Sequence, residues 1–164
     1  MIRVDHAGEY GAVRIYEGQL AVLGTRKDAA KTVAAIKRMA EQEQRHLKKF
    51  DELINERRVR PTALEPVWRV AGFTLGAVTA MMGEKAAMAC TAAVEEVIDS
   101  HYARQIDRLS DAELKKTVED FRRDEIAHRE EALAHGAKDA PGYRILSEAV
   151  KAGCRLAIHL SERL

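Results

Sequence analysis

The fold is first indicated by the stretch Leu114–Ala132, LKKTVEDFRRDEIAHREEA. Its apolar residues recur at intervals of three and four, so they fall on one stripe of an α-helix. The same stripe contains Glu125 and His128, which are three residues apart and share one face of the helix. An ionised glutamate among apolar side chains is unfavourable unless it is paired or bound to metal. The stretch therefore predicts a core-facing helix with a buried polar site on it.

The E-x-x-H pattern occurs a second time, at Glu43 and His46. Each motif alone is weak evidence, because Glu and His at this spacing also arise on solvated helices. Glu43, however, is in phase with the apolar side chains of its own segment, which are Val33, Ile36, Leu47, Phe50 and Ile54. Two motifs that are both in phase with a core indicate that their side chains meet inside the protein.

Length and composition favour one all-α domain spanning residues 1–164. Ten Gly and three Pro are too few for a turn-rich β protein, and no stretch alternates with period two for long enough to predict a strand. The 27 Lys and Arg against 26 Asp and Glu give a net charge of +1, which argues against a nucleic-acid partner. Two cysteines without a C-x-x-C motif indicate neither a disulfide framework nor a thiolate zinc site.

Six helices follow from the periodicity and from the start and stop signals. Ser110 is the expected N-cap of the fifth helix, since Glu113 stands three residues later, and His135-Gly136 ends that helix. The predicted helices run from about Asp5 to Leu23, from after Asp28 to about Arg57, from Val67 to Gly83, from Ala86 to Leu109, from Ser110 to His135, and from Tyr143 to Arg163.

The first and fourth predicted helices each add one glutamate in phase with the core. Glu9 shares its face with Val13 and Tyr16. On the fourth helix Glu95 is in register with Ile98 and Tyr102, whereas Glu96 lies on a polar face. We therefore predict that Glu95 points inward and Glu96 outward. The chain then reads as two similar helical hairpins, each supplying a glutamate followed by an E-x-x-H motif.

Four carboxylates and two imidazoles from four helices are typical of a dinuclear carboxylate site in a ferritin-like four-helix bundle. The nitrogen and oxygen donors suit iron or manganese better than copper(I) or structural zinc. In the alternative interpretation, arginines or lysines satisfy the four glutamates in a plain bundle, which requires several coincidences of phase. The predicted metal ligands are Glu9, Glu43, His46, Glu95, Glu125 and His128.

The other four histidines have less specific interpretations. We expect His6, at the frayed start of the first helix, to have an outer or capping role, and His135 to act as an electrostatic cap. His101 lies too far around its helix to join Glu95, but it neighbours Tyr102 and can hydrogen-bond a ligand or substrate. For His159 a surface position is a sufficient interpretation.

Two further segments bear on membrane contact. The stretch from Val70 to Gly83, VAGFTLGAVTAMMG, carries no charge but is shorter than the roughly 20 residues that a spanning helix needs. It is either a buried core segment or an interfacial one. The last helix is amphipathic, which usually means only packing on its own core. Together the two segments make peripheral membrane contact an even alternative to simple packing.

With these residues in place, the chain closely resembles the demethoxyubiquinone hydroxylase family of ubiquinone biosynthesis, also called the Coq7 family. The resemblance covers essentially all 164 residues. Its strings are long and specific: IRVDHAGEYGA from Ile2, HLKKFDELI from His46, VRPTALEPVW from Val59, AMACTAAVEE from Ala87 and AGCRLAIHLSERL from Ala152.

The resemblance implies a di-iron monooxygenase that inserts one oxygen atom from O2 into a polyprenylated methoxy-benzoquinol, demethoxyubiquinol. The family's iron ligands fall on the six residues predicted above. Its His-Tyr pair matches His101 and Tyr102, which the resemblance links to electron or proton delivery near the iron. The isoprenoid tail requires an apolar channel open to the bilayer, for which Val70–Gly83 and the last helix are the candidate walls.

The start at Met1, without an Arg- and Ser-rich leader, fits a peripheral protein on the cytoplasmic face of a bacterial inner membrane. A mature protein on the matrix side of the mitochondrial inner membrane has the same appearance. In eukaryotes the family works with a lipid-presenting partner protein, and the sequence leaves open whether one exists here. The rival functions are a ferritin-like ferroxidase or iron-binding bundle and a metal-free helical scaffold.

Overall fold

The computed structural model describes residues 1–164 and contains helices but no strands, which confirms the predicted all-α class. Short 3-10 turns precede α2, at Lys27–Ala29, and α6, at Ala137–Asp139. The six α-helices are α1 (Ile2–Leu23), α2 (Ala30–Glu56), α3 (Glu65–Met81), α4 (Glu84–Ile106), α5 (Ala112–Ala134) and α6 (Tyr143–Arg163).

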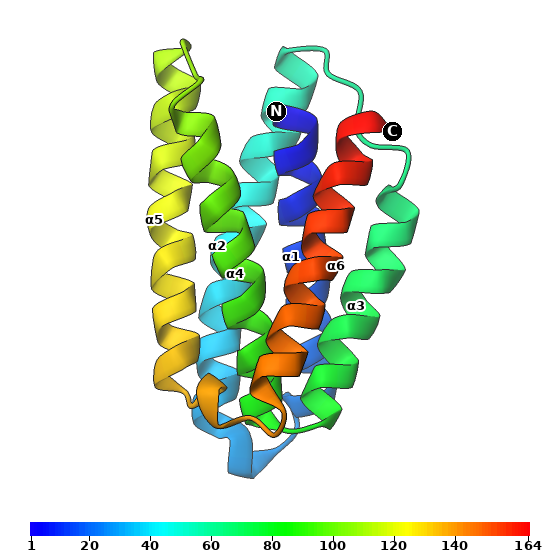
Figure 1. Ribbon diagram of the computed structural model, residues 1–164, viewed down its shortest axis with the longest axis vertical. Helices are drawn as coiled ribbons and strands as arrows, with labels where there is room; N and C mark the ends of the chain where they lie inside the picture. Colours follow the sequence, from blue (N-terminus) through cyan, green and yellow to red (C-terminus); the bar gives the residue numbers. More distant parts are fainter.

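Consecutive helices run antiparallel, and both ends of the chain lie at the same end of the molecule (Figure 1). Helices α1, α2, α4 and α5 form a four-helix bundle, in which α1 packs on α2 and α4 packs on α5. Helix α3 packs against α1, and α6 packs against α4 and α1, so both lie on one side of the bundle. This arrangement is consistent with the predicted ferritin-like bundle carrying two additional helices.

Most helix limits lie close to the predicted ones, and α6 has the predicted limits. Helix α3 begins before the predicted start because Pro66 occupies its first turn, where a missing N–H is harmless. Helix α4 begins directly after Gly83, whose φ of 119° ends the preceding helical backbone. The predicted N-cap Ser110 is wrong: Asp111 caps α5, because its carboxylate accepts the backbone N–H groups of Glu113 and Leu114 at 3.1 Å.

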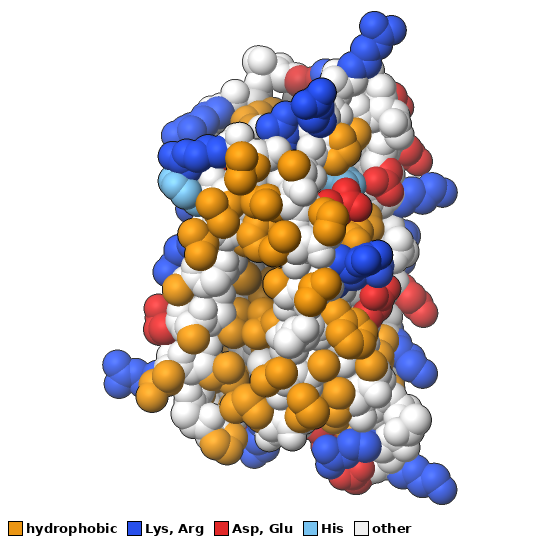
Figure 2. Space-filling view, turned by 90° about the vertical axis from the view of Figure 1, so that its right-hand side faces the viewer, with side chains coloured by type: hydrophobic (Ala, Val, Ile, Leu, Met, Phe, Trp, Pro, Cys, Tyr) orange, Lys and Arg blue, Asp and Glu red, His pale blue; other side chains and the backbone are white.

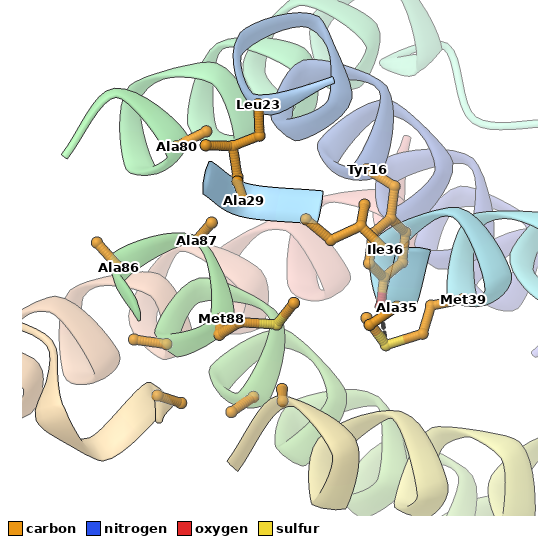
Figure 3. Packing of buried hydrophobic residues seen from close by; sticks show 14 of the residues in the cluster. Tyr16, Leu23, Ala29, Ala35, Ile36, Met39, Ala80, Ala86, Ala87 and Met88 are labelled. Carbon is orange, nitrogen blue, oxygen red and sulfur yellow. Dashed lines mark hydrogen bonds between the residues drawn. The ribbon is translucent and has the colours of Figure 1, made fainter. Parts of the chain in front are cut away.

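One hydrophobic cluster fills the end of the bundle where α1 ends and α4 begins (Figure 3). Its large side chains are Tyr16, Leu23, Ile36 and Met39, all of which are at most 1% exposed. The facing residues of α4 are mainly alanines, and their small side chains let the larger ones interdigitate. Packing at this end fixes the four bundle helices in register and therefore positions the polar residues that lie further along them.

Glycines allow α1 and α3 to approach each other backbone to backbone. A Cβ atom added to Gly76 would lie 2.0 Å from the carbonyl oxygen of Ile15, and one added to Gly18 would lie 2.1 Å from that of Phe73. Both distances are shorter than any van der Waals contact, so a side chain at either position must push the helices apart. The charge-free character of Val70–Gly83 thus partly reflects close helix packing.

We expect Gly76→Ala to lower the free energy of unfolding by about 1–3 kcal/mol, the usual cost of overpacking a tight site. The matched control is Gly153→Ala on α6, where an added Cβ meets nothing within 4 Å. At an uncrowded helical position alanine is favoured over glycine by up to about 1 kcal/mol. Urea unfolding of both variants checks the prediction, which fails if the two variants change stability in the same direction.

Helices α3 and α6 present an apolar surface, so the interpretation of Val70–Gly83 as a buried core segment is wrong for most of its residues. On α3 only Gly72, Gly76, Thr79 and Ala80 are buried. Figure 2 shows hydrophobic side chains gathered over this face, which is hollowed between the two helices. We call the exposed residues of this surface the apolar face; they are Val67, Val70, Phe73, Val78, Met81 and Met82 with Ile145 and Leu156 of α6. None of the helices combines the length and the hydropathy that crossing a bilayer demands.

Candidate metal centre

The structure brings together all six side chains that the sequence analysis selected as metal ligands. Two of them are the single glutamates of α1 and α4, and the other four belong to the E-x-x-H motifs of α2 and α5. Each of the six residues is at most 2% exposed: Glu9, Glu43, His46, Glu95, Glu125 and His128. Glu96 instead pairs with Lys151 at 2.7 Å and is part-exposed, which confirms the predicted orientations of Glu95 and Glu96.

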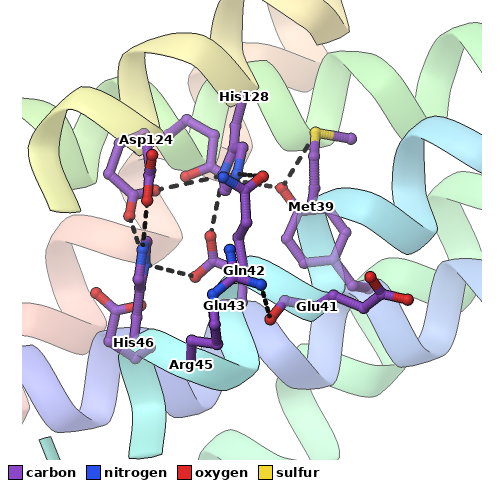
Figure 4. Close-up of polar contacts among 12 residues, drawn as sticks. Met39, Glu41, Gln42, Glu43, Arg45, His46, Asp124 and His128 are labelled. Carbon is purple, nitrogen blue, oxygen red and sulfur yellow. Dashed lines mark hydrogen bonds and ion pairs between the residues drawn. The ribbon is translucent and has the colours of Figure 1, made fainter. Parts of the chain in front are cut away.

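The carboxylates of the two E-x-x-H motifs lie between the two imidazoles. Glu43 places one oxygen 3.0 Å from Nδ1 of His128 and the other 3.9 Å from Nδ1 of His46. Glu125 places one oxygen 3.2 Å from Nδ1 of His46 and the other 3.8 Å from Nδ1 of His128. Both carboxylates therefore lie within reach of both imidazoles, and Glu43 and the two imidazoles are visible in Figure 4.

The remaining two glutamates each belong to one side. Glu9 lies 3.4 Å from Nδ1 of His46, and Glu95 lies 4.0 Å from Nδ1 of His128. Two overlapping groups of potential metal donors result, and within each group the donor atoms lie within 4.8 Å of one another. One group is Glu9, Glu43, His46 and Glu125, and the other is Glu43, Glu95, Glu125 and His128.

Each imidazole is held by the residue that precedes the opposite E-x-x-H motif. His46 donates its Nε2–H to Asp124 at 3.0 Å, and His128 donates its Nε2–H to the side-chain oxygen of Gln42 at 3.1 Å (Figure 4). In the neutral imidazole the proton then lies on Nε2, and Nδ1 is a lone pair that faces the carboxylates. Such outer partners orient metal-binding histidines and increase their basicity.

Glu9 and Glu95 are each held by a tyrosine of the other helix. Tyr16 of α1 donates its hydroxyl to Glu95 of α4 at 2.6 Å, and Tyr102 of α4 donates its hydroxyl to Glu9 of α1. Each tyrosine stands seven residues after the glutamate of its own helix, so E-x6-Y occurs twice. From its position in the sequence Tyr16 is predicted only to lie in the core, and Asp124 and Gln42 have no predicted role. The repeats of E-x6-Y and of a polar residue before E-x-x-H are the signals that identify them.

The pKa shifts reflect four acids crowded in a buried space. Burial, and then the negative charges of Glu9 and Glu95, hold the pKa of Glu43 well above its usual range. Burial and the other carboxylates do the same to the pKa of Glu125. Burial also opposes ionisation of Glu9, but the hydrogen bond and charge of His46, together with hydrogen bonds from Glu43 and Tyr102, outweigh it, so the pKa of Glu9 is lowered. Burial and mutual repulsion therefore oppose the ionisation of Glu43 and Glu125 in the protein alone.

The donor set fits metal cations. No lysine or arginine pairs with any of the four glutamates, which removes the plain-bundle alternative. Buried polar atoms without a partner cost about 1–3 kcal/mol each, so a cluster of them indicates a binding site for a ligand. The buried atoms without a hydrogen bond include Oε2 of Glu9, both oxygens of Glu43 and Glu125, Oε2 of Glu95, and Nδ1 of His46 and His128.

We expect Asp124→Asn to weaken metal binding by about 10–100-fold, the usual effect of altering a partner of a metal-bound histidine. An amide in place of the carboxylate accepts a weaker hydrogen bond from His46, and this lowers the basicity of Nδ1. Asp120→Asn is the matched control, because Asp120 lies one turn earlier on α5 and pairs only with the surface residue Arg123. Competition titrations with a chromogenic chelator compare the two, and equal affinities would contradict the role of Asp124.

Of the four histidines outside the cluster, His6 lies in a different environment from the predicted one. His6 is not at a frayed helix start, because α1 begins at Ile2; it is buried and bonds Asp51 of α2 at 2.9 Å. His101 is not among the potential metal donors, as expected, and lies 3.0 Å from Asp5. His135 is the C-cap residue directly after α5, and His159 lies on the exposed side of α6 next to Arg163.

An apolar cavity of about 480 Å³ connects the hollow between α3 and α6 with the cluster. Its wall is mostly hydrophobic and is formed by residues of α1, α3, α4 and α6. At the inner end it is lined by Glu9, Tyr102, His101 and Asp5, and on the exposed side by Gly153 and Leu156. A site of this size with few convergent polar groups is suited to a mainly apolar small molecule.

Fold and site together define a class of protein, an all-helical bundle whose buried carboxylates and histidines can bind metal. The family described as "Ubiquinone biosynthesis protein COQ7" matches residues 1–161, and the chain belongs to this family.

Relatives from distant organisms are similar over nearly the whole chain. A 3-demethoxyubiquinol 3-hydroxylase of Rhodospirillum rubrum is 57% identical over 165 residues, which cover 99% of this chain and 76% of the relative. The human "NADPH-dependent 3-demethoxyubiquinone 3-hydroxylase, mitochondrial" is 51% identical over 170 residues, covering 100% of this chain and 76% of the relative. The Saccharomyces cerevisiae "5-demethoxyubiquinone hydroxylase, mitochondrial" is 39% identical over 181 residues, covering 100% and 77%.

Proposed function

We propose that this protein is a di-iron monooxygenase that hydroxylates demethoxyubiquinol with O2, a step of ubiquinone biosynthesis. The hydroxylation itself follows from membership of the family and from the shared names of its relatives. One structural observation carries the proposal further: the apolar cavity ends at Glu9, a member of the buried cluster. A polyprenylated ring that enters this cavity reaches the cluster with its head group first.

The six predicted ligands have assigned places in this proposal. Glu43 and Glu125 would be shared by two iron ions, Glu9 and His46 would complete the donors of one ion, and Glu95 and His128 would complete those of the other. When bound, the iron ions supply the redox chemistry that activates O2. Four further residues hold these side chains in place by hydrogen bonds. Tyr16 and Tyr102 fix the carboxylates of Glu95 and Glu9. Asp124 and Gln42 fix the imidazoles of His46 and His128.

The remaining work of the chain is to hold and orient the ring. The hydrophobic wall of the cavity excludes water, which strengthens polar contacts at the inner end and protects reactive species. Tyr102 and His101 both lie at that end, so the proposed role of this pair in electron or proton delivery remains compatible with their position. The hydrogen bond from Tyr102 to Glu9 connects this end of the cavity with the cluster, and His101 bonds Asp5 beside it.

A ferroxidase is the main alternative, because it uses a similar ligand order. It has no need of an apolar cavity that opens on an apolar face, and this observation favours the hydroxylase. The test adds O2 to anaerobically reduced protein together with a demethoxyubiquinol analogue. Appearance of the hydroxylated quinol supports the hydroxylase, whereas oxidation of iron with unchanged quinol refutes it. Two iron atoms per chain by elemental analysis are expected in either case, and their absence would leave only a metal-free scaffold.

The site of action that fits this function is a membrane surface, where the long isoprenoid tail resides. The apolar face surrounds the cavity and provides the contact, with the tail extending from the cavity into the bilayer. The protein is then peripheral, on the cytoplasmic face of a bacterial inner membrane or on the matrix side of the mitochondrial one. A lipid-presenting partner protein, where one exists, has the same face available.

Membrane contact is tested by adding charge to the apolar face. We expect the triple variant Val70→Glu, Phe73→Glu and Leu156→Glu to lose flotation with vesicles of phosphatidylcholine and phosphatidylethanolamine, because charged side chains resist insertion. Control substitutions with the same added charge are Ala34→Glu, Gln44→Glu and Ala112→Glu, which are exposed on α2 and α5. Unchanged flotation of the first variant would remove the apolar face as the contact surface.

A further inference from the structure

The names of the relatives differ in the redox state that they give to the ring of the substrate. The bacterial protein is named for a demethoxyubiquinol and the human one for a demethoxyubiquinone. A quinol ring carries hydroxyl groups that donate hydrogen bonds, whereas a quinone ring offers carbonyl oxygens that only accept them. A side chain that accepts hydrogen bonds but donates none, placed beside the bound ring, therefore discriminates between the quinol and the quinone.

Asp5 has this position and this property. It lies on α1 one turn before Glu9, so the two side chains share a helix face, and both line the cavity. Asp5 is 3% exposed, although it is ionisable and stands in a mainly apolar wall. His101 and Tyr102 line the same cavity.

The two carboxylate oxygens of Asp5 differ in their surroundings. Oδ1 accepts a hydrogen bond from the side-chain amide of Gln105 and lies 3.0 Å from Nε2 of His101. Oδ2 is buried and has no hydrogen-bond partner in the protein. Gln105 and His101 therefore fix the carboxylate through one oxygen and leave the other available as an acceptor. A buried unpartnered acceptor is unfavourable, and a donor from a ligand removes that cost.

We propose that Oδ2 of Asp5 accepts a hydrogen bond from a ring hydroxyl of the quinol and thereby selects the reduced ring over the quinone. The inference rests on the proposed function, since it names the group that recognises the head group of that substrate. A quinone carbonyl placed against Oδ2 brings two acceptors together and leaves both unpaired. A site built to bond a hydroxyl rejects an analogue that lacks it, because its polar group then stays unsatisfied. Asp5 is thus a specificity-determining residue, and His101 and Gln105 position it.

The test measures the affinities of the two ring forms separately. The full chain is loaded with Mn²⁺ and kept under nitrogen, so that the metal site is filled but neither probe is turned over. The probes are a demethoxyubiquinol with a short isoprenoid tail and its quinone. Trp68 provides the readout, because it is the only tryptophan of the chain and lines the cavity, so that a bound ring quenches its fluorescence.

We expect the wild-type chain to bind the quinol about 10–100-fold more tightly than the quinone, the range of a hydrogen bond to a charged acceptor. In Asp5→Asn this ratio is expected to fall to about one or to reverse, because the amide can donate to a carbonyl. The matched control is Asp51→Asn, which also changes an aspartate paired with a histidine, His6, but lies outside the cavity. Its ratio is expected to remain that of the wild type.

The outcomes separate the inference from the proposed function. Binding of neither ring form to the wild-type chain would refute the function and the inference together. Equal binding of both forms, or tighter binding of the quinone, would leave the function standing and overturn the role of Asp5. This wild-type comparison decides the matter even if Asp5→Asn fails to fold. A ratio that survives unchanged in folded Asp5→Asn, checked by circular dichroism, would overturn it as well.

Discussion

Replacing Glu125 by alanine is expected to abolish iron binding and hydroxylation without lowering the stability of the metal-free chain. Glu125 contacts both imidazoles through its two oxygens, so its loss removes a donor from both groups at once. Metal affinity should fall by more than about 100-fold, the upper effect of altering an outer partner. In the metal-free chain, burial and the neighbouring carboxylates hold the pKa of Glu125 well above its usual range. Removing this acid therefore relieves crowding, which offsets the packing that is lost.

Iron content by elemental analysis, turnover, and thermal unfolding with and without a chelator measure these effects. Glu96→Ala is the matched control on α4, since Glu96 pairs with Lys151 and lies outside the cluster. It is expected to keep both iron and activity. Loss of iron in Glu96→Ala would mean that the inner carboxylate of α4 is wrongly assigned. A metal-free Glu125→Ala chain much less stable than the metal-free wild type would show that Glu125 is mainly structural.

Filling the cavity from its exposed side is expected to stop hydroxylation while leaving the metal cluster intact. Gly153 lines the cavity and is exposed, and an added Cβ meets nothing within 4 Å, so Gly153→Trp can fold without a backbone clash. The indole then occupies space that a polyprenylated ring needs. We expect kcat/KM for the quinol to fall at least tenfold, about 1.4 kcal/mol or more in transition-state stabilisation.

The same variant separates the hydroxylase from a ferroxidase. Iron content and the rate at which O2 oxidises the reduced iron are expected to stay near the wild-type values, because the cluster lies at the other end of the cavity. Gly153→Ala, which adds one methyl group at the same position, is the control and should retain hydroxylation. Full hydroxylation by Gly153→Trp would mean that the substrate reaches the cluster by another route.

Much of the site could be predicted from the sequence because helix periodicity is a local property. Glu125 and Glu43 stand on apolar stripes, and this phase alone places them inside the bundle. The same argument separates Glu95 from Glu96, and their burial confirms it. The prediction for His6 failed because a frayed helix start was assumed, whereas α1 begins several residues earlier and packs this residue against α2.

The repeated spacings could mark Tyr16 and Asp124, but their crossed partners were beyond sequence reasoning because each contact joins residues far apart in the chain. Tyr16 bonds Glu95 and Asp124 bonds His46 only once the four helices are packed in register. The exposure of α3 is another such case, since a charge-free segment is equally compatible with a buried core or an exposed apolar face. Its glycines against α1 and its outward apolar side chains decide between them.

The sequence by itself determined the fold class, the approximate limits of the helices and which six side chains cluster inside the bundle, because these depend on spacing within single helices. Only the tertiary structure decided which donors lie between the two imidazoles, where the cavity runs, and that Asp5 lies at its inner end. The physical reason is that these features depend on distances between helices. Such distances are set by side-chain packing and backbone approach across the whole bundle.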